Sequence, residues 1–149
     1  MLFIHYLAHV IPAQQKRHLE LHNDIKQISL LAEFIEKIAA EKQLDETLAM
    51  NLNLALEEAV TNVILYAYPK ETDGLVNIEA IMKENSLEFI ITDSGVPFDP
   101  TAAPEADITL SADERPIGGL GIFMVRKLMD EVHYQRVDDK NVLKMIKNI

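Results

Sequence analysis

The stretch that decides the fold of this chain is Leu54-Ala-Leu-Glu-Glu-Ala-Val-Thr-Asn-Val-Ile-Leu-Tyr66, a largely apolar run. Within it, Glu58 and Asn62 are four positions apart, so on a helix both side chains project from the same face, one turn apart. A carboxylate and a carboxamide in that arrangement can hold a hydrated Mg²⁺ ion and orient a hydroxyl for attack on a phosphate. The alternative is the solvated face of an amphipathic helix. Because the other residues of the run are nearly all apolar, we expect the pair to line a cavity or its edge.

Outward from this stretch, the hydrophobic pattern alternates between the periods of helices and of strands. Helices are predicted over residues 25–42, 45–68 and 120–130. Strands are predicted over residues 18–22, 75–82, 87–92, 132–137 and 142–149. Asp24 and Asp45 are placed to cap the first two helices. This order of elements predicts an α+β fold, a two-layer sandwich in which helices cover one face of a mostly antiparallel mixed sheet.

The composition is that of a soluble globular protein, and it limits the classes of partner. With 149 residues, the chain is long enough for one domain, which we place at residues 18–149. A net charge of -10 argues against a nucleic-acid partner, because neutralising phosphates requires a basic face. The chain has no cysteine, which excludes disulfides and thiolate metal sites.

Residues 1–17 form an apolar N-terminal extension in this reading. Its apolar part ends at Pro12 and is shorter than the roughly 20 residues that span a membrane. It also lacks the positive start of a signal peptide and carries His5 and His9. We expect it to pack on the domain or on a second subunit, with a mis-assigned start codon as the alternative. These observations predict a cytoplasmic protein without a membrane partner.

The second motif, Asp93-Ser-Gly-Val-Pro-Phe-Asp99, follows a predicted strand. As a ligand site, Asp93 would accept a hydrogen bond from an exocyclic amine such as that of adenine, and Gly95 would let a base approach the backbone. The structural alternative is a turn in which the aspartate caps the loop and the glycine takes a positive φ. The loop over residues 96–116 that follows is rich in Pro, Ala and acidic residues, and long loops of this kind are usually functional or mobile.

The third motif, Gly118-Gly-Leu-Gly121, precedes a predicted helix. Glycines there leave backbone N–H groups uncovered, and the helix N-terminus adds the positive end of its dipole, so that an anion can bind. The alternative is a flexible hinge. The motif is neither a Walker A loop nor a dinucleotide fingerprint on a parallel βαβ unit.

In this order, the three motifs resemble those of the histidine-kinase-like ATPases (the GHKL or Bergerat fold). Glu58-Ala-Val-Thr-Asn62 is similar to their N box, Asp93-Ser-Gly-Val-Pro-Phe-Asp99 to their G1 box, and residues 118–130 to their G2 box. Within that superfamily, the chain is most similar to the stand-alone anti-sigma-factor serine kinases of bacterial stress and sporulation switches. The likeness lies in the length, in the Glu-Ala-Val-Thr-Asn wording and in the ending Leu-Met-Asp-Glu-Val, and it covers residues 18–149.

The resemblance implies a role for each site residue. Glu58 would be the general base that activates a serine hydroxyl, and Asn62 would ligate the Mg²⁺ that bridges the ATP phosphates. Asp93 would read the adenine amine, with Gly95 beneath the base. The loop over residues 96–116 would be the lid over the nucleotide. The other residues implied in nucleotide binding, on this lid and around the phosphates, are Arg115, Gly118, Gly119, Leu120 and Gly121.

Two features depart from the family's pattern. Many members carry a threonine on the late strand that touches the hydrogen-bond network beside the adenine, whereas Asn141-Val-Leu-Lys-Met145 has none. The lid is also poor in basic residues, with Arg115 the only one between Thr92 and Gly118. Charge stabilisation would then rest on Mg²⁺ with Arg115, or on Arg126, which we expect on the solvated face of its helix.

The function that the resemblance implies is an ATP- and Mg²⁺-dependent serine/threonine protein kinase that is also an anti-sigma factor. Such a protein phosphorylates a STAS-type anti-anti-sigma protein on serine, sequesters a sigma factor and forms a homodimer. The alternative is a non-catalytic ATP-binding module that switches partners.

Overall fold

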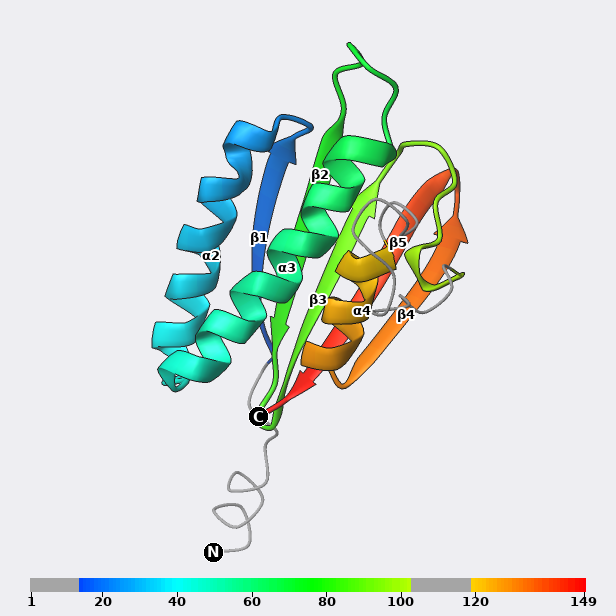
Figure 1. The fold of residues 1–149 in the computed structure, drawn as a ribbon. Coiled ribbons are helices and arrows are strands. Elements are labelled where there is room, and N and C mark those ends of the chain that lie inside the picture. Colours follow the sequence, from blue (N-terminus) through cyan, green and yellow to red (C-terminus); the bar gives the residue numbers. More distant parts are fainter. Residues whose placement is uncertain (1–13, 103–118) are drawn as a thin grey trace, which may run out of the picture.

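Five segments with alternating apolar residues form one sheet in the computed structural model, which describes residues 14–102 and 119–149 (Figure 1). The strands are β1 (Gln15–His22), β2 (Leu75–Met82), β3 (Ser86–Asp93), β4 (Glu131–Val137) and β5 (Lys140–Asn148). Their order in the sheet is β1-β2-β3-β5-β4, and each neighbouring pair is antiparallel. The sheet was expected to be mixed, but the described residues contain no parallel pair.

Three α-helices lie on one face of this sheet (Figure 1). They are α2 (Ile28–Glu41), α3 (Glu46–Tyr66) and α4 (Gly119–Leu128), and the short 3-10 turns are η1 (Ile25–Gln27) and η2 (Pro100–Ala102). Asp45 caps α3, as predicted, by accepting a hydrogen bond from Leu48 N at 2.7 Å. Asp24 accepts from Lys26 N at 2.9 Å, but it caps η1 and not α2, because the helix predicted from residue 25 begins as a 3-10 turn and becomes α-helical only at Ile28. Helix α2 lies on the β1 side of the sheet, α4 lies on the β4 side, and α3 runs between them (Figure 1).

The hydrophobic core fills the space between the sheet and the helices. Along β2 every second residue is buried, because successive side chains of a strand point to opposite faces. The largest fully buried side chains are Phe89, Leu21, Leu31, Ile35, Ile38, Leu52, Leu56, Ile78, Leu87, Ile91, Ile122 and Met145. They come from the sheet and from all three helices, which confirms the predicted α+β two-layer sandwich.

The hairpin between β4 and β5 turns on two residues. Asp138 and Asp139 have φ values of 50° and 62°, in the left-handed region that a two-residue hairpin turn of this class requires at both positions. The turn sends β5 into the sheet between β3 and β4, with Asn141 opposite Asp93. The last strand of the sequence is thereby a central strand, beside the motif that begins at Asp93.

Two of the sequence predictions fall on residues that the structure does not describe. They are the packing of the apolar N-terminal extension, of which residues 1–13 lie outside the described part, and the lid over residues 96–116, of which residues 103–116 do. In the described part of the chain, no helix has the length and apolar character needed to cross a membrane.

Candidate functional site

Glu58 and Asn62 lie half buried on α3, on the side that faces the first turn of α4. A β-carbon built on Gly121 would lie 3.0 Å from Glu58 Oε2 and 3.4 Å from Asn62 Nδ2. The first and third sequence motifs are therefore in contact. The missing side chain at residue 121 allows α4 to approach the polar pair this closely.

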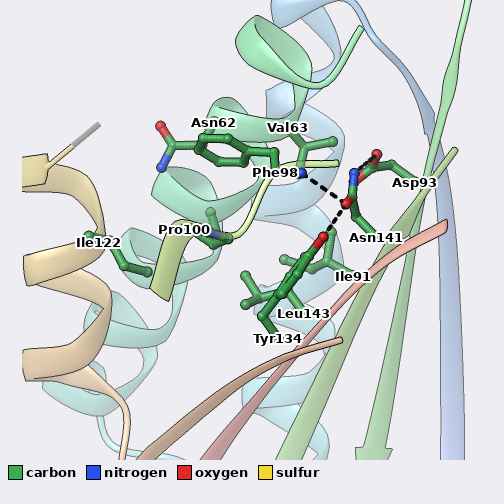
Figure 2. A pocket seen from close by; sticks show the side chains of 11 residues that line it. Asn62, Val63, Ile91, Asp93, Phe98, Pro100, Ile122, Tyr134, Asn141 and Leu143 are labelled. Carbon is green, nitrogen blue, oxygen red and sulfur yellow. Dashed lines mark hydrogen bonds between the residues drawn. The ribbon is translucent and has the colours of Figure 1, made fainter. Parts of the chain in front are cut away.

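A pocket opens between α3, the sheet and the turn after β3 (Figure 2). The pocket is narrow: about 390 Å³ lies between its walls when open solvent is counted, but the centre of a water molecule can occupy only about 20 Å³ of it. Figure 2 shows Asn62 on one side of it and Asp93 with Asn141 on the other. The walls between them are apolar and come mainly from Val63, Ile91, Phe98, Ile122 and Leu143. An apolar slot with a few convergent polar groups is suited to a flat aromatic ligand such as a nucleobase.

Asp93 is the buried carboxylate of this pocket, with 3% of the residue exposed. Its Oδ1 accepts hydrogen bonds from Gly95 N at 2.9 Å and from Asn141 Nδ2 at 2.8 Å. Burial raises the pKa of the Asp93 carboxyl above its ordinary value, while the hydrogen bonds from Asn141 and Gly95 and the charge of Arg136 oppose that shift. A carboxyl group that lies in the wall of a pocket although burial disfavours its charged form is a candidate ligand-binding group.

Asn141 belongs to the site, and the sequence reasoning missed it. That reasoning recorded only that the late strand has no threonine. In the structure, Asn141 is 5% exposed, lines the pocket and donates directly to Asp93. A signal was present in the sequence, because Asn141 shares the inward-facing phase of β5 with Leu143 and Met145, and a polar side chain in that phase needs internal partners.

The structure gives a steric reason for glycine at position 95. A β-carbon there would lie 2.2 Å from the carbonyl oxygen of Ala67, at the C-terminal end of α3. The same oxygen accepts a hydrogen bond from Val96 N at 2.8 Å. The structural alternative for this motif is half right: Asp93 caps the loop by accepting from Gly95 N, but the φ of Gly95 lies outside the left-handed region. The place of Gly95 beneath a base stays a prediction.

The third motif forms the start of α4, whose first residues are Gly119, Leu120 and Gly121. Exposed N–H groups and the positive dipole end of a helix attract anions, and Glu58 and Asn62 lie beside this end. Arg115 and Gly118, which were implied in nucleotide binding, lie outside the described residues.

Arg126 does not lie on the solvated face of α4, where we expected it. It is half buried, and its Nη2 donates a hydrogen bond to the carbonyl oxygen of Thr101 in η2. The reason is that the Thr101 carbonyl lies within hydrogen-bond reach of the Arg126 guanidinium. Arg126 thus links η2, in the loop after the Asp93 motif, to α4.

The donors of the site suit Mg²⁺ better than a transition metal. Glu58 and Asn62 offer hard oxygen atoms, and Mg²⁺ is typically bound through one or two such groups, with water and substrate phosphates as its other ligands. In residues 14–102 and 119–149, no group of three or more His, Asp or Glu side chains could enclose a metal alone. The pair therefore fits an ion that arrives with a phosphorylated ligand.

Residues 21–147 match the sequence model of the family described as "Histidine kinase-like ATPase domain". The chain belongs to this family. The family resemblance of the sequence is thereby confirmed, and the arrangement of α3, the Asp93 turn and α4 around one pocket is how this histidine kinase-like ATPase domain brings its three motifs together.

The chain is also similar to curated proteins that are named serine-protein kinases. The chain is 35% identical over 86 residues to the serine-protein kinase RsbW of Listeria monocytogenes serovar 1/2a. The aligned stretch covers 55% of this chain and 55% of that protein. It is 32% identical over 97 residues to the serine-protein kinase RsbW of Bacillus cereus strain AH820. That alignment covers 62% of this chain and 60% of that protein. The chain thus spans little more than half the length of the curated relatives it matches.

A solved structure supports the fold. The crystal structure of the RsbU and RsbW domains of Rv1364c from Mycobacterium tuberculosis aligns with 89% of this chain and 32% of that chain, with a TM-score of 0.64. At 14% identity, this likeness shows the fold alone.

Proposed function

We propose that this chain is an ATP- and Mg²⁺-dependent serine/threonine protein kinase that also acts as an anti-sigma factor. The observation that carries the proposal is that Asn62 and Asp93 line the same pocket, while Glu58 lies one helical turn from Asn62 and against the start of α4. One ligand with an amine-bearing ring at one end and phosphates at the other would meet all three groups. ATP is such a ligand.

In this mechanism, each residue acts on a different part of the reaction. The Glu58 carboxylate takes the proton of the acceptor serine hydroxyl as its oxygen attacks the γ-phosphorus. The new phosphorus–oxygen bond forms as the bond to ADP breaks. Asn62 and the N-terminus of α4 orient the phosphates, and bound Mg²⁺ supplies neutralisation of their charge. Phosphoryl transfer depends chiefly on positioning and charge neutralisation, which are the roles that these groups would fill.

The proposed partners rest on the resemblance of the sequence to the anti-sigma-factor serine kinases. They are a STAS-type anti-anti-sigma protein as the phosphate acceptor and a sigma factor as the sequestered partner. We also propose a homodimer that works in the cytoplasm. The curated relatives are named serine-protein kinases, which supports serine as the residue that accepts the phosphate.

The decisive experiment is to incubate the purified protein with γ-labelled ATP, Mg²⁺ and STAS proteins of the same genome. Label on a serine of one STAS protein is the expected result. A STAS variant without that serine and a reaction with EDTA are the controls. If ATP binds and no label is transferred, the kinase assignment is wrong.

The alternative, a non-catalytic ATP-binding module that switches partners, has one observation in its favour. Among the described residues, no lysine or arginine lines the pocket, and the guanidinium of Arg126 is engaged with Thr101. A kinase usually places a cation near the transferred phosphoryl group. ATP-dependent capture of a sigma factor without transfer would support this module.

The Asp93→Asn variant should bind adenine nucleotides about 10- to 100-fold more weakly than the wild type, because a donor replaces the charged acceptor that faces the base. Its thermal stability at pH 7 should be equal or higher. The pKa of Asp93 is raised in the folded state, so its ionisation lowers stability as pH rises through the raised pKa, and an amide removes that cost.

Calorimetric titration with ATP and thermal unfolding between pH 4 and pH 8 would test both parts of this prediction. Asp73→Asn is the matched control, since Asp73 lies in an exposed loop and undergoes the same chemical change. Unchanged ATP affinity in Asp93→Asn would remove Asp93 from adenine recognition. A lower melting temperature at pH 7 would contradict the stability argument.

A further inference from the structure

Asn141 lies where three strands and the Asp93 turn meet. It is the second residue of β5, paired with Asp93 on β3 and with Arg136 on β4. Only 5% of the residue is exposed. A carboxamide buried at this depth must find its hydrogen-bond partners inside the protein.

All hydrogen-bonding capacity of the Asn141 side chain is used by the protein. Its Nδ2 donates to Asp93 Oδ1 and to the carbonyl oxygen of Val96, both at 2.8 Å. Its Oδ1 accepts from Phe98 N at 3.1 Å and from the hydroxyl of Tyr134 at 2.6 Å (Figure 2). A primary amide has two donors and two acceptor sites, so none is left for a ligand.

The two carboxylate oxygens of Asp93 differ in their hydrogen bonding within the protein. Oδ1 accepts from Asn141 and from Gly95 N, so it is committed to the protein. Asp93 also lines the pocket, and no buried side-chain oxygen in the described part of the chain lacks a partner. Oδ2 accepts no hydrogen bond from the described residues, so it is not among the buried atoms and is the oxygen exposed to the pocket, where a ligand can reach it.

The same amide also fixes the wall of the pocket. Through Val96 O and Phe98 N, it fastens the turn that places the Phe98 ring against the pocket. Arg136 reinforces the turn from β4, since its Nη1 donates to Gly95 O at 2.9 Å. One side chain thereby sets both the direction of the carboxylate and the position of the aromatic wall.

We propose that Asn141 is a positioning residue that determines nucleobase specificity: it turns Oδ2 of Asp93 towards the amine of the base and holds the Val96–Phe98 turn as the wall of the base pocket. This inference rests on the proposed ATP site but is independent of phosphoryl transfer. Asn141 touches no ligand and acts only through Asp93 and the turn.

The Asn141→Asp variant separates the donor from the acceptor of this side chain. It keeps an oxygen for Phe98 N and Tyr134 but replaces the Nδ2 donor by a second carboxylate oxygen facing Asp93. Ionised, the two carboxylates repel each other, and a proton shared between them restores a donor at lower pH. The other groups near Asp93 are Arg136, whose charge favours the carboxylate, and the hydroxyls of Tyr68 and Tyr134.

The experiment compares Kd values for ATP and GTP between wild type and Asn141→Asp from about pH 5.5 to pH 8 by calorimetric titration. At pH 8 we expect ATP affinity to fall about tenfold or more, the preference for ATP over GTP to shrink, and the loss of ATP affinity to recover as pH falls. Asn77→Asp is the matched control, because Asn77 lies on β2 on the face opposite the core.

A loss that is equal for ATP and GTP and constant over pH would mean that Asn141 is merely structural, and would overturn the inference. ATP binding without phosphoryl transfer would overturn only the kinase proposal. If Asn141→Asp does not fold, the side-chain amide protons of Asn141 in wild-type protein give the test by NMR. The pH at which the chemical shifts of these protons are half changed reports the ionisation of Asp93. It should fall when ATP binds, because the amine of the base stabilises the Asp93 carboxylate. An unchanged midpoint would contradict the proposal.

Discussion

The Glu58→Gln variant is expected to transfer phosphate about 10²- to 10⁴-fold more slowly than the wild type while it binds ATP with similar affinity. Glutamine has nearly the shape of glutamate, so it should keep the contact with Gly121, but it cannot accept the proton of the serine hydroxyl. Initial rates with labelled ATP and the STAS acceptor give the first quantity, and calorimetric titration gives the second.

Glu57→Gln is the matched control for this prediction, because the neighbouring Glu57 is exposed and undergoes the same change. It should transfer phosphate at the wild-type rate. If Glu58→Gln transfers at that rate too, another group is the base. If it loses ATP affinity in proportion to rate, Glu58 acts in binding rather than in proton transfer.

Replacing Gly95 by alanine is expected to destabilise the fold by about 3 kcal/mol or more, a larger loss than most single substitutions cause. The added β-carbon would lie 2.2 Å from the Ala67 carbonyl oxygen and 2.6 Å from its carbonyl carbon. These are backbone atoms at the end of α3, so they cannot move aside as the tip of a side chain can. The hydrogen bond from Val96 N to the same oxygen would be strained as well.

Urea unfolding of Gly95→Ala, with Ser94→Ala as the exposed neighbouring control, measures this effect. A loss of less than about 1 kcal/mol would show that the turn can move away from α3 at little cost. The nucleotide pocket should be disturbed in the same variant, because the turn that carries Phe98 begins at this point.

Local patterns in the sequence predicted most of the fold because the elements here obey local rules. The N-caps Asp24 and Asp45 and the strand β2 lie where hydrogen-bonding side chains and strict alternation indicate them. The errors at element ends are small, such as the start of β1 at Gln15 rather than at residue 18. Burial of one face then gives the two-layer arrangement directly.

The features that sequence reasoning missed depend on contacts between distant residues. Asn141 and Asp93 are 48 residues apart, and their hydrogen bond depends on the register between β3 and β5. The contact of Gly95 with Ala67 and the hydrogen bond from Arg126 to Thr101 likewise depend on how a turn packs against a helix. Periodicity carries no information on such pairs, although an inward-facing asparagine on a strand is a warning that one exists.

The central position of β5 has a consequence for folding during synthesis on the ribosome. Strand β5 is synthesised after every other described element, yet it pairs with both β3 and β4 and supplies the amide that orients Asp93. A nascent chain that ends before residue 140 leaves an edge of β3 unpaired and lacks the Asn141 amide, one of the two donors to the buried Asp93 carboxylate. The pocket is therefore completed only after β5 has been synthesised, and under the proposed function nucleotide would stabilise the folded domain but not its incomplete precursor.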